Sequence, residues 1–159
     1  MVMISRTETS EGTERKLRVL FVCTHNSARS QMAEGYLRAY YGDLFEAGSA
    51  GTEVGVLNPL AVAVMEEIEI DISGHRSKLI DEFFDWGADI VVTVCDIAHQ
   101  SCPLLPGAKT VIHINFPDPS DCGGIPEECL TLFRNVRNAI IAWIDRTLVP
   151  VYEHKRRLP

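Results

Sequence analysis

The feature that most restricts the fold is an apolar run that passes directly into a polar loop and then into a helical pattern. Leu17 to Val22 consists, apart from Arg18, of Leu, Val and Phe, which is typical of a buried parallel strand. Cys23 to Ser30 follows without a break. From Ser30 to Gly42, apolar residues recur at helical spacing, and they are Met32, Ala33, Tyr36, Leu37 and Tyr40. The segment predicts a strand, a loop and a helix in succession.

The loop has the composition of an oxyanion site. Five residues separate Cys23 from Arg29, enough to wrap backbone N–H groups around a tetrahedral oxyanion in front of the positive end of the helix. The guanidinium closes the ring, and the positive field favours the nucleophilic thiolate. The predicted oxyanion-binding residues are Thr24, His25, Asn26, Ser27, Ala28, Arg29 and Ser30. We expect Asn26 to hold the loop and Ser30 to contact the sulfur; the alternative is a buried cysteine with an unrelated arginine nearby.

Strand and helix patterns alternate along the rest of the chain. Strand patterns cover 45–50, 89–94 and 110–114, and helical patterns cover 58–68, a short stretch 79–86, and 127–147. This alternation predicts an α/β fold, a parallel four-stranded sheet flanked by helices, with the site at the carboxyl ends of the strands. We expect one domain over 17–149, a flexible leader over 1–16 and a carboxyl-terminal tail over 150–159.

Charge and composition argue against several classes of partner. The 159 residues have a formal charge of −7 and no block of Lys and Arg, so we expect no nucleic-acid or membrane partner. No apolar run is long enough to span a membrane, and residues 1–16 lack a signal-peptide core, which predicts a cytoplasmic protein. Five cysteines fit free, metal-bound or redox-active thiols better than a static disulfide framework.

An acid lies in a rigid turn near the end of the last strand pattern. The prolines on both sides of Asp118, Pro117 and Pro119, restrict the backbone and hold the carboxyl group in one place. Asp118 is therefore a candidate general acid that protonates a leaving oxygen when Cys23 attacks. The alternative is that the Asp-Pro sequence only makes a turn.

Several segments together resemble the thioredoxin-coupled arsenate reductases, which share the fold of the low-molecular-weight phosphotyrosine phosphatases. These segments are Cys23–Gly35, Ser49–Thr52, Asn58–Pro59, Ile70–Ser73 and Val91–Cys95, and the similarity extends from Leu17 to Asp145. The resemblance implies a monomer without a cofactor that reduces arsenate to arsenite, with phosphate and sulfate as analogues and thioredoxin as partner. The phosphatases share the oxyanion loop and the Asp-Pro turn, so these features do not separate the two activities.

The resemblance also implies a relay of three cysteines. Cys23 attacks arsenate and Asp118 protonates the departing oxygen; Cys95 then forms a disulfide with Cys23 as arsenite leaves, and Cys102 resolves it to Cys95–Cys102 for thioredoxin. A helix between the last two cysteines would keep their sulfurs about 10 Å apart, so residues 96–101 must rearrange. Taken singly, Cys95 suits an ordinary buried thiol and Cys102 a spectator.

Two rival functions remain open at this point. One is a tyrosine-phosphate phosphatase, which needs only Cys23, Arg29 and Asp118. The other is a thiol-based redox sensor that uses Cys95 and Cys102 without arsenate. Glutaredoxin or a small thiol could replace thioredoxin as the reductant without any change at Cys23 or Asp118.

A few residues depart from the family pattern. Some reductases bind potassium through the positions that match Asn26, Glu34 and Ser49, and through an acidic residue where this chain has Lys78. We expect Lys78 to pair with Glu34 in place of the ion, and we expect no metal site. The alternative is a solvated surface lysine.

His25 and Ala28 replace a small residue and a cysteine in the loop. Cys122 and Cys129 match nothing in the family; a zinc site with His99 or His113 is disfavoured, and we expect spectators or auxiliary thiols.

Overall fold

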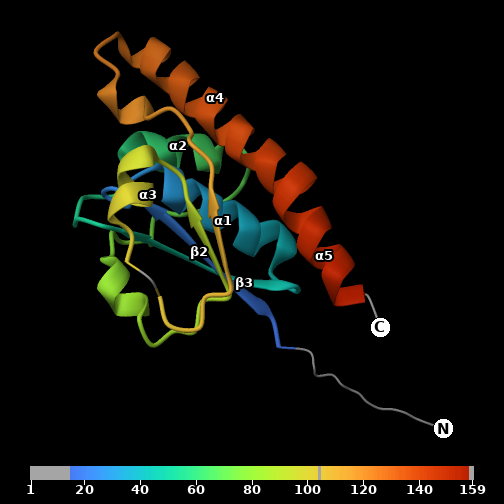
Figure 1. Ribbon diagram of the computed structural model, residues 1–159. Coiled ribbons are helices and arrows are strands. Elements are labelled where there is room, and N and C mark those ends of the chain that lie inside the picture. Colours follow the sequence, from blue (N-terminus) through green and yellow to red (C-terminus); the bar gives the residue numbers. More distant parts are fainter. Residues whose placement is uncertain (1–14, 104, 158–159) are drawn as a thin grey trace, which may run out of the picture.

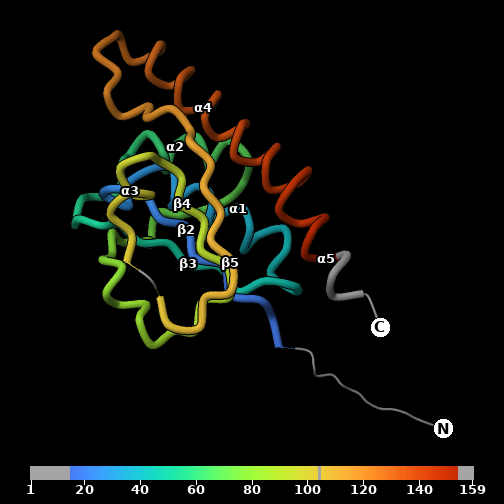
Figure 2. Tube along the Cα trace, in the orientation of Figure 1, coloured from blue at the N-terminus to red at the C-terminus, as the bar shows by residue number. Residues whose placement is uncertain are grey.

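A four-stranded parallel sheet forms the centre of the fold in the computed structural model, which describes residues 15–103 and 105–157. Its strands are β2 (Leu17–Cys23), β3 (Phe45–Gly51), β4 (Ile90–Thr93) and β5 (Thr110–His113). They lie in the order β3-β2-β4-β5, and every neighbouring pair is parallel (Figure 2). The predicted fold class and the four strand positions are confirmed.

Burial follows the position of each strand in the sheet. All four residues of β4 and the last five of β2 are buried, as expected for central strands covered on both faces. The edge strand β5 alternates between partly buried and exposed residues. In the register, Cys23 pairs with Gly51, and Val22 pairs with Thr93. The segments that follow β2 and β4 therefore leave the sheet at the same edge.

Helices cover the sheet and each other. Helix α1 (Arg29–Tyr41) packs on β2 and β3, and α2 (Pro59–Glu66) and α4 (Pro126–Trp143) pack on α1 and on each other. In Figure 1, α4 continues into α5 (Val149–Arg157) as one long rod. A π-helical turn, Ile144–Leu148, joins the two.

The carboxyl-terminal end differs from the prediction. We expected the last helix to end near Thr147 and a tail to follow, but the chain is helical through Arg157. Val149 and Tyr152 are buried against the common core, and this apolar packing keeps the chain in the helix. Pro150 donates no N–H, and it is the second residue after the π-helical turn, in which the regular hydrogen-bond pattern is already shifted.

The shorter elements also differ in detail. Asn58 caps α2 by accepting a hydrogen bond from the Leu60 N–H at 2.8 Å, as predicted, but α2 ends at Glu66. The amphipathic stretch 79–86 forms only one 3₁₀ turn, Ile80–Phe83, and residues 96–101 form a short helix, α3 (Asp96–Ser101). Of the proposed leader, only residues 15 and 16 lie within the described part of the chain.

Candidate active site

The oxyanion loop lies at the carboxyl edge of the sheet, between β2 and α1. Cys23 is the last residue of β2 and is 3% exposed. Its Sγ lies 2.8 Å from the hydroxyl oxygen of Ser30, so the expected contact between this hydroxyl and the sulfur is present. A hydroxyl hydrogen bond stabilises a thiolate more than a thiol, and the N-terminus of α1 acts in the same direction.

Asn26 holds the loop in shape through several hydrogen bonds. Its side-chain amide donates to the Ser30 hydroxyl at 2.8 Å, and its Oδ1 accepts from the Lys78 backbone N–H and from Gln31 Nε2, each at 2.9 Å. Asn26 has a φ of 53°, in the left-handed region that asparagine tolerates better than most residues. The loop also passes close to Gly51, where a Cβ atom would lie 2.7 Å from the Thr24 carbonyl oxygen. The backbone around Cys23 is thus held from both sides.

Arg29 and Asp118 face each other across the mouth of the loop. Arg29 is buried; its Nη1 donates to the Phe116 carbonyl at 2.9 Å, and its Nη2 lies 3.4 Å from Asp118 Oδ2. Asp118 also accepts from the Ser120 N–H at 2.9 Å, which caps the 3₁₀ turn Pro119–Asp121. Asp118 is therefore both the turn residue and a side chain directed toward the loop.

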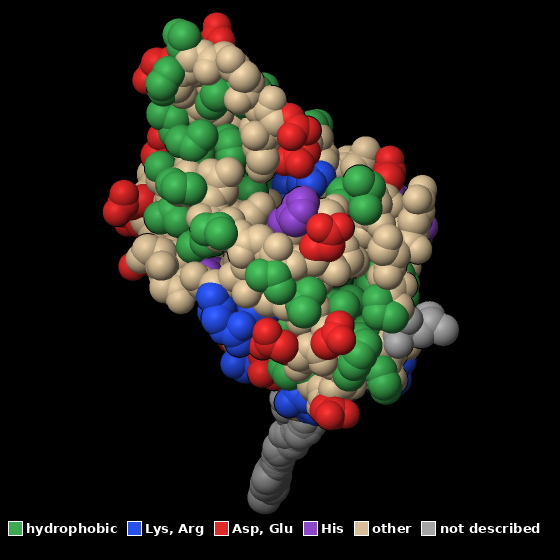
Figure 3. Space-filling view, turned by 90° about the vertical axis from the view of Figure 1, so that its left-hand side faces the viewer, with side chains coloured by type: hydrophobic (Ala, Val, Ile, Leu, Met, Phe, Trp, Pro, Cys, Tyr) green, Lys and Arg blue, Asp and Glu red, His purple; other side chains and the backbone are tan. Residues whose placement is uncertain are grey.

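A pocket of about 140 Å³ lies between the loop and the acid-bearing turn. It is lined by Cys23, His25, Ser27, Ala28, Arg29, Asp118, Ser120 and Asp121. This volume corresponds to a few water molecules, which suits a small tetrahedral oxyanion better than an extended ligand. The face at this edge of the sheet has acidic, basic and histidine side chains close together, with no continuous basic surface (Figure 3). We therefore expect the attraction of an anion to be local, through the loop and Arg29.

Cys95 lies beside the oxyanion loop. It lies two residues after the end of β4, is 6% exposed, and its Sγ is 3.3 Å from the hydroxyl oxygen of Thr24. The same sulfur accepts a hydrogen bond from the Ala98 N–H at 3.4 Å and so caps α3. The structure thus brings Cys95 to the residue next to Cys23, a contact that sequence reasoning did not identify.

Cys102 is separated from this group by the whole of α3. It is half-buried at the carboxyl end of the helix, and its N–H donates to the Ala98 carbonyl at 2.8 Å. At 1.5 Å per residue, the helix places the two cysteines about 10 Å apart along its axis. Burial raises the pKa of the Cys102 thiol. The structure therefore unites Cys23, Arg29, Asp118 and Cys95, and keeps Cys102 apart.

Comparison with known proteins identifies the family of the chain. Residues 18–140 match the family model of the low molecular weight phosphotyrosine protein phosphatases. The chain belongs to this family. Within it, the chain is 46% identical over 122 residues to an arsenate reductase of Halalkalibacterium halodurans, covering 77% of this chain and 88% of the relative. An arsenate reductase of Bacillus subtilis is 44% identical over the same coverage of both chains.

Solved structures give the same grouping. An arsenate reductase in the reduced state superposes with a TM-score of 0.68 at 31% identity, over 85% of this chain and 98% of that chain. A thioredoxin-dependent arsenate reductase of Corynebacterium glutamicum has a TM-score of 0.57 at 25% identity, over 83% of this chain and 63% of that one. Both the phosphatase-type fold and the resemblance to arsenate reductases are confirmed for this family member.

In this phosphatase-family chain, Lys78 pairs with Glu34 as expected. Lys78 Nζ lies 3.8 Å from Glu34 Oε1, and the side chain of Lys78 is only 14% exposed. The buried Glu34 carboxylate also accepts from the Ser49 hydroxyl and forms an ion pair with Arg38. Burial lowers the pKa of Lys78, while Glu34 acts in the opposite direction. The alternative of a fully solvated lysine is wrong.

We predict that potassium has no specific effect on this protein, because the ammonium group of Lys78 and the guanidinium of Arg38 already neutralise Glu34. Melting temperature and activity should change no more with potassium than with sodium at equal ionic strength. Calorimetric melting in the two salts checks this, with Lys78→Ala as the variant in which potassium could regain a place. A specific rise in melting temperature with potassium in the unmodified protein would show that Lys78 does not occupy the position of the ion.

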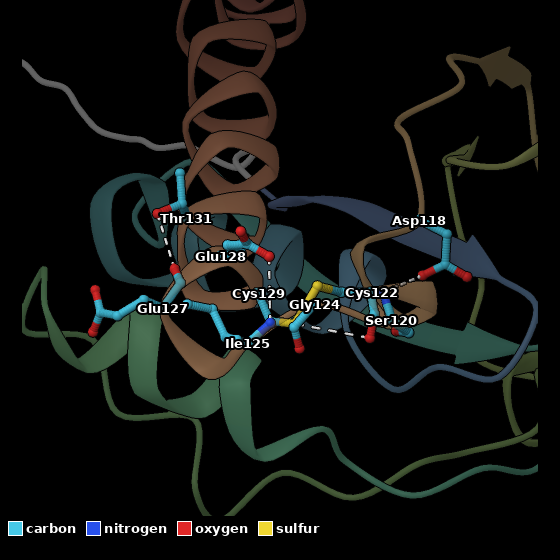
Figure 4. Close-up of a disulfide and its surroundings, with 9 residues drawn as sticks. All are labelled: Asp118, Ser120, Cys122, Gly124, Ile125, Glu127, Glu128, Cys129 and Thr131. Atoms are coloured by element: carbon cyan, nitrogen blue, oxygen red, sulfur yellow. Dashed lines mark hydrogen bonds between the residues drawn. A yellow bond between two sulfur atoms is a disulfide. The ribbon is translucent and has the colours of Figure 1, made fainter.

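Cys122 and Cys129 form a disulfide, so the expectation of free spectator or auxiliary thiols is wrong. Figure 4 shows that this disulfide joins the segment after Asp118 to the first turns of α4. The backbone brings their Cα atoms to 5.6 Å, well within the range for a disulfide. The free cysteines among the described residues are Cys23, Cys95 and Cys102, which are the three assigned to the relay.

We predict that replacing both Cys122 and Cys129 by serine lowers the free energy of unfolding by roughly 2–3 kcal/mol, because the bond closes a short loop in the unfolded chain. Guanidinium denaturation with and without dithiothreitol measures this change. The reductant should destabilise the unmodified protein and leave the double variant unaffected. Equal stability of the two proteins would mean that the disulfide does not stabilise the fold.

Other residues complete the description of the site. Ser120 and Asp121 line the pocket although sequence reasoning singled out only Asp118 in this turn; their position directly after Pro119 is the signal that could have found them.

Within the described residues, no group of three or more His, Cys, Asp and Glu side chains is arranged to hold a metal ion. None of the described helices is both long and apolar enough to cross a membrane.

Proposed function

We propose that this protein is an arsenate reductase that works through a relay of Cys23, Cys95 and Cys102 and is regenerated by thioredoxin. The observation with the most weight is the position of Cys95, whose Sγ lies 3.3 Å from Thr24 in the oxyanion loop. A phosphatase needs no second thiol at this place. The arsenate reductases among the relatives and the thioredoxin-dependent one from Corynebacterium glutamicum support the same function.

The first step is attack of the Cys23 thiolate on arsenic. A sulfur–arsenic bond forms and the bond from arsenic to one hydroxyl group of arsenate breaks; this hydroxyl takes a proton from Asp118 and leaves as water. The backbone N–H groups of the loop and Arg29 hold the remaining oxygens. Arg29 can do this while its Nη1 stays on the Phe116 carbonyl, because a guanidinium has five N–H donors. The oxyanion then competes with Asp118 for Nη2.

The second step moves two electrons to arsenic. The Cys95 thiolate attacks the Cys23 sulfur, a sulfur–sulfur bond forms, and the sulfur–arsenic bond breaks with its electron pair on arsenic, which leaves as arsenite. In the third step Cys102 attacks Cys95 and releases Cys23 as a thiolate. The Cys95–Cys102 disulfide is then reduced by the two thiols of thioredoxin. We propose that these steps occur in a cytoplasmic monomer.

Consumption of NADPH by thioredoxin reductase and thioredoxin, upon addition of arsenate, tests this function. Turnover that requires arsenate, thioredoxin and the protein together is expected. Hydrolysis of a phosphate ester without arsenate-dependent turnover would favour the phosphatase. Oxidation of Cys95 and Cys102 by peroxide, without turnover of arsenate, would favour the redox sensor. Replacement of thioredoxin by glutaredoxin and glutathione identifies the reductant.

Asp118→Asn should lower the rate of arsenate reduction by roughly 10²–10⁴-fold, because asparagine cannot give a proton to the leaving oxygen. Asparagine retains a side-chain oxygen that can cap the turn at Ser120, so the fold around it is kept. Steady-state rates, together with the melting temperature, measure the effect. Asp85→Asn, the same change at an exposed residue outside this pocket, serves as the control. An unchanged rate in Asp118→Asn would return Asp118 to the role of a turn residue.

A further inference from the structure

The short helix α3 is fastened to the sheet by a polar network. His113, the last residue of β5, lies with Nε2 2.8 Å from Asp96 Oδ1 in the first turn of α3. The hydroxyl of Thr93, at the end of β4, lies 3.0 Å from His113 Nδ1 and 3.3 Å from His99 Nδ1. The rings of His99 and His113 stack with their centroids 4.2 Å apart. Two residues of α3 are thus held by two strands.

The position of α3 gives this network its significance. The helix is the whole of the segment between Cys95 and Cys102, and it has only six residues. Isolated helices of this length are unstable in water, so α3 depends on its attachments. One attachment is the Cys95 sulfur, which accepts the Ala98 N–H. When Cys95 forms a disulfide with Cys23, its sulfur becomes a weaker acceptor and moves toward the loop, and this cap is weakened.

A cavity of about 270 Å³ lies beside α3 and next to Cys102, lined among others by Thr93, His99, Cys102 and Val111. Its walls are mainly apolar side chains from β4, β5 and the segment after α3. The Cys102 segment therefore borders free space on one side. Ala98 is fully buried in the core and Cys102 packs against this core, so the polar contacts of α3 act together with packing to hold Cys102 in place.

We propose that Asp96, Thr93, His99 and His113 form a latch that keeps α3 folded and controls the step in which Cys102 resolves the Cys23–Cys95 disulfide. The inference rests on the proposed relay. The latch residues are positioning residues, because they touch neither the oxyanion nor a reacting sulfur. In the controlled step the Cys102 thiolate, having lost its proton to solvent, attacks Cys95 Sγ; the Cys95–Cys102 bond forms, the Cys23–Cys95 bond breaks, and Cys23 leaves as a thiolate.

The test is a single turnover of His113→Ala with one equivalent of arsenate, stopped by acid, alkylated and mapped by mass spectrometry. Alanine removes the contacts to Asp96, Thr93 and His99 together. The Cys23–Cys95 disulfide should form at an unchanged rate, and the Cys95–Cys102 disulfide should form about fivefold faster, as expected for the loss of one partly exposed hydrogen bond. Glu82→Gln is the matched control, because it removes an exposed ion pair, with Arg76, that includes no residue of α3 or of the latch.

A second variant separates the latch from a general loss of stability. Asp96→Ala should also accelerate formation of the Cys95–Cys102 disulfide. In the double variant the acceleration should be smaller than the product of the two single accelerations, since both substitutions act through one contact. Amide exchange in residues 96–101 should be faster in each. An unchanged or slower second step in both single variants would overturn the latch. Absence of both the Cys23–Cys95 and the Cys95–Cys102 disulfide after arsenate is added to the unmodified protein would instead contradict the proposed relay.

Discussion

Cys23→Ser is expected to abolish both arsenate reduction and phosphate-ester hydrolysis, a loss of more than about 10⁴-fold. Serine is nearly the same size as cysteine, so the contact with the Ser30 hydroxyl and the shape of the pocket are retained. A serine hydroxyl is not ionised at neutral pH, and the hydrogen-bond partner of the Cys23 side chain is the Ser30 hydroxyl and not a histidine that could remove a proton. The chemistry is therefore lost while the fold remains.

Two measurements make this result specific. The melting temperature of Cys23→Ser should stay close to that of the unmodified protein, and phosphate or sulfate should still raise it by binding in the oxyanion loop. The control is the double serine variant of Cys122 and Cys129, which should lose stability but keep turnover well below its melting temperature. Turnover in Cys23→Ser would refute the assignment of Cys23 as the nucleophile.

The parts of the fold that sequence patterns predict well are those in which local and tertiary preferences agree. The apolar run of β2 leads into the Cys23 loop and then into the helical period of α1, and all three form as predicted, because a buried central strand and an amphipathic helix each have a distinct period. The cap at Asn58 was predictable for a similar reason, since a side-chain oxygen before a proline at the first helical position satisfies free N–H groups locally.

The parts that sequence patterns miss depend on contacts between distant segments. The helix beyond Thr147 forms because Val149 and Tyr152 reach the core, which no local pattern encodes. Cys122 and Cys129 are paired because the chain turns between them, whereas the odd number of cysteines favoured free thiols. The stacked pair of His99 and His113 requires α3 to lie over the end of β5, and this placement follows only from the assembled sheet.

The candidate site shows the same division. Cys23, Arg29 and Asp118 were found from sequence because each lies at a recognisable place, a loop before a helix or a turn between prolines, and the structure brings them to one pocket. The contact between Thr24 and Cys95 joins residues 71 positions apart and could not be derived from spacing. A net charge of −7 also gives no hint of the proposed anion site, because the expected attraction comes from the loop N–H groups and the buried Arg29.

Cys95→Ser and Cys102→Ser are expected to stop the reaction at different points. Cys102→Ser should complete one turnover, release one equivalent of arsenite and stop as a Cys23–Cys95 disulfide, because only the resolving thiol is missing. Cys95→Ser should release no arsenite and form no disulfide between these sites. Both variants should retain phosphate-ester hydrolysis, which needs only Cys23, Arg29 and Asp118.

The structure explains why this pair of variants is decisive. Cys95 lies against the oxyanion loop, while Cys102 is at the far end of α3, so the first disulfide can form without Cys102 and the second requires α3 to open. Arsenite release after one equivalent of arsenate, with peptide mapping of the disulfides, measures both outcomes, and phosphate-ester hydrolysis in each variant controls for an intact pocket. Full multiple turnover in Cys102→Ser would exclude Cys102 as the resolving thiol. An external thiol would then have to attack the Cys23–Cys95 disulfide directly, and the rate of turnover would rise with the concentration of that thiol.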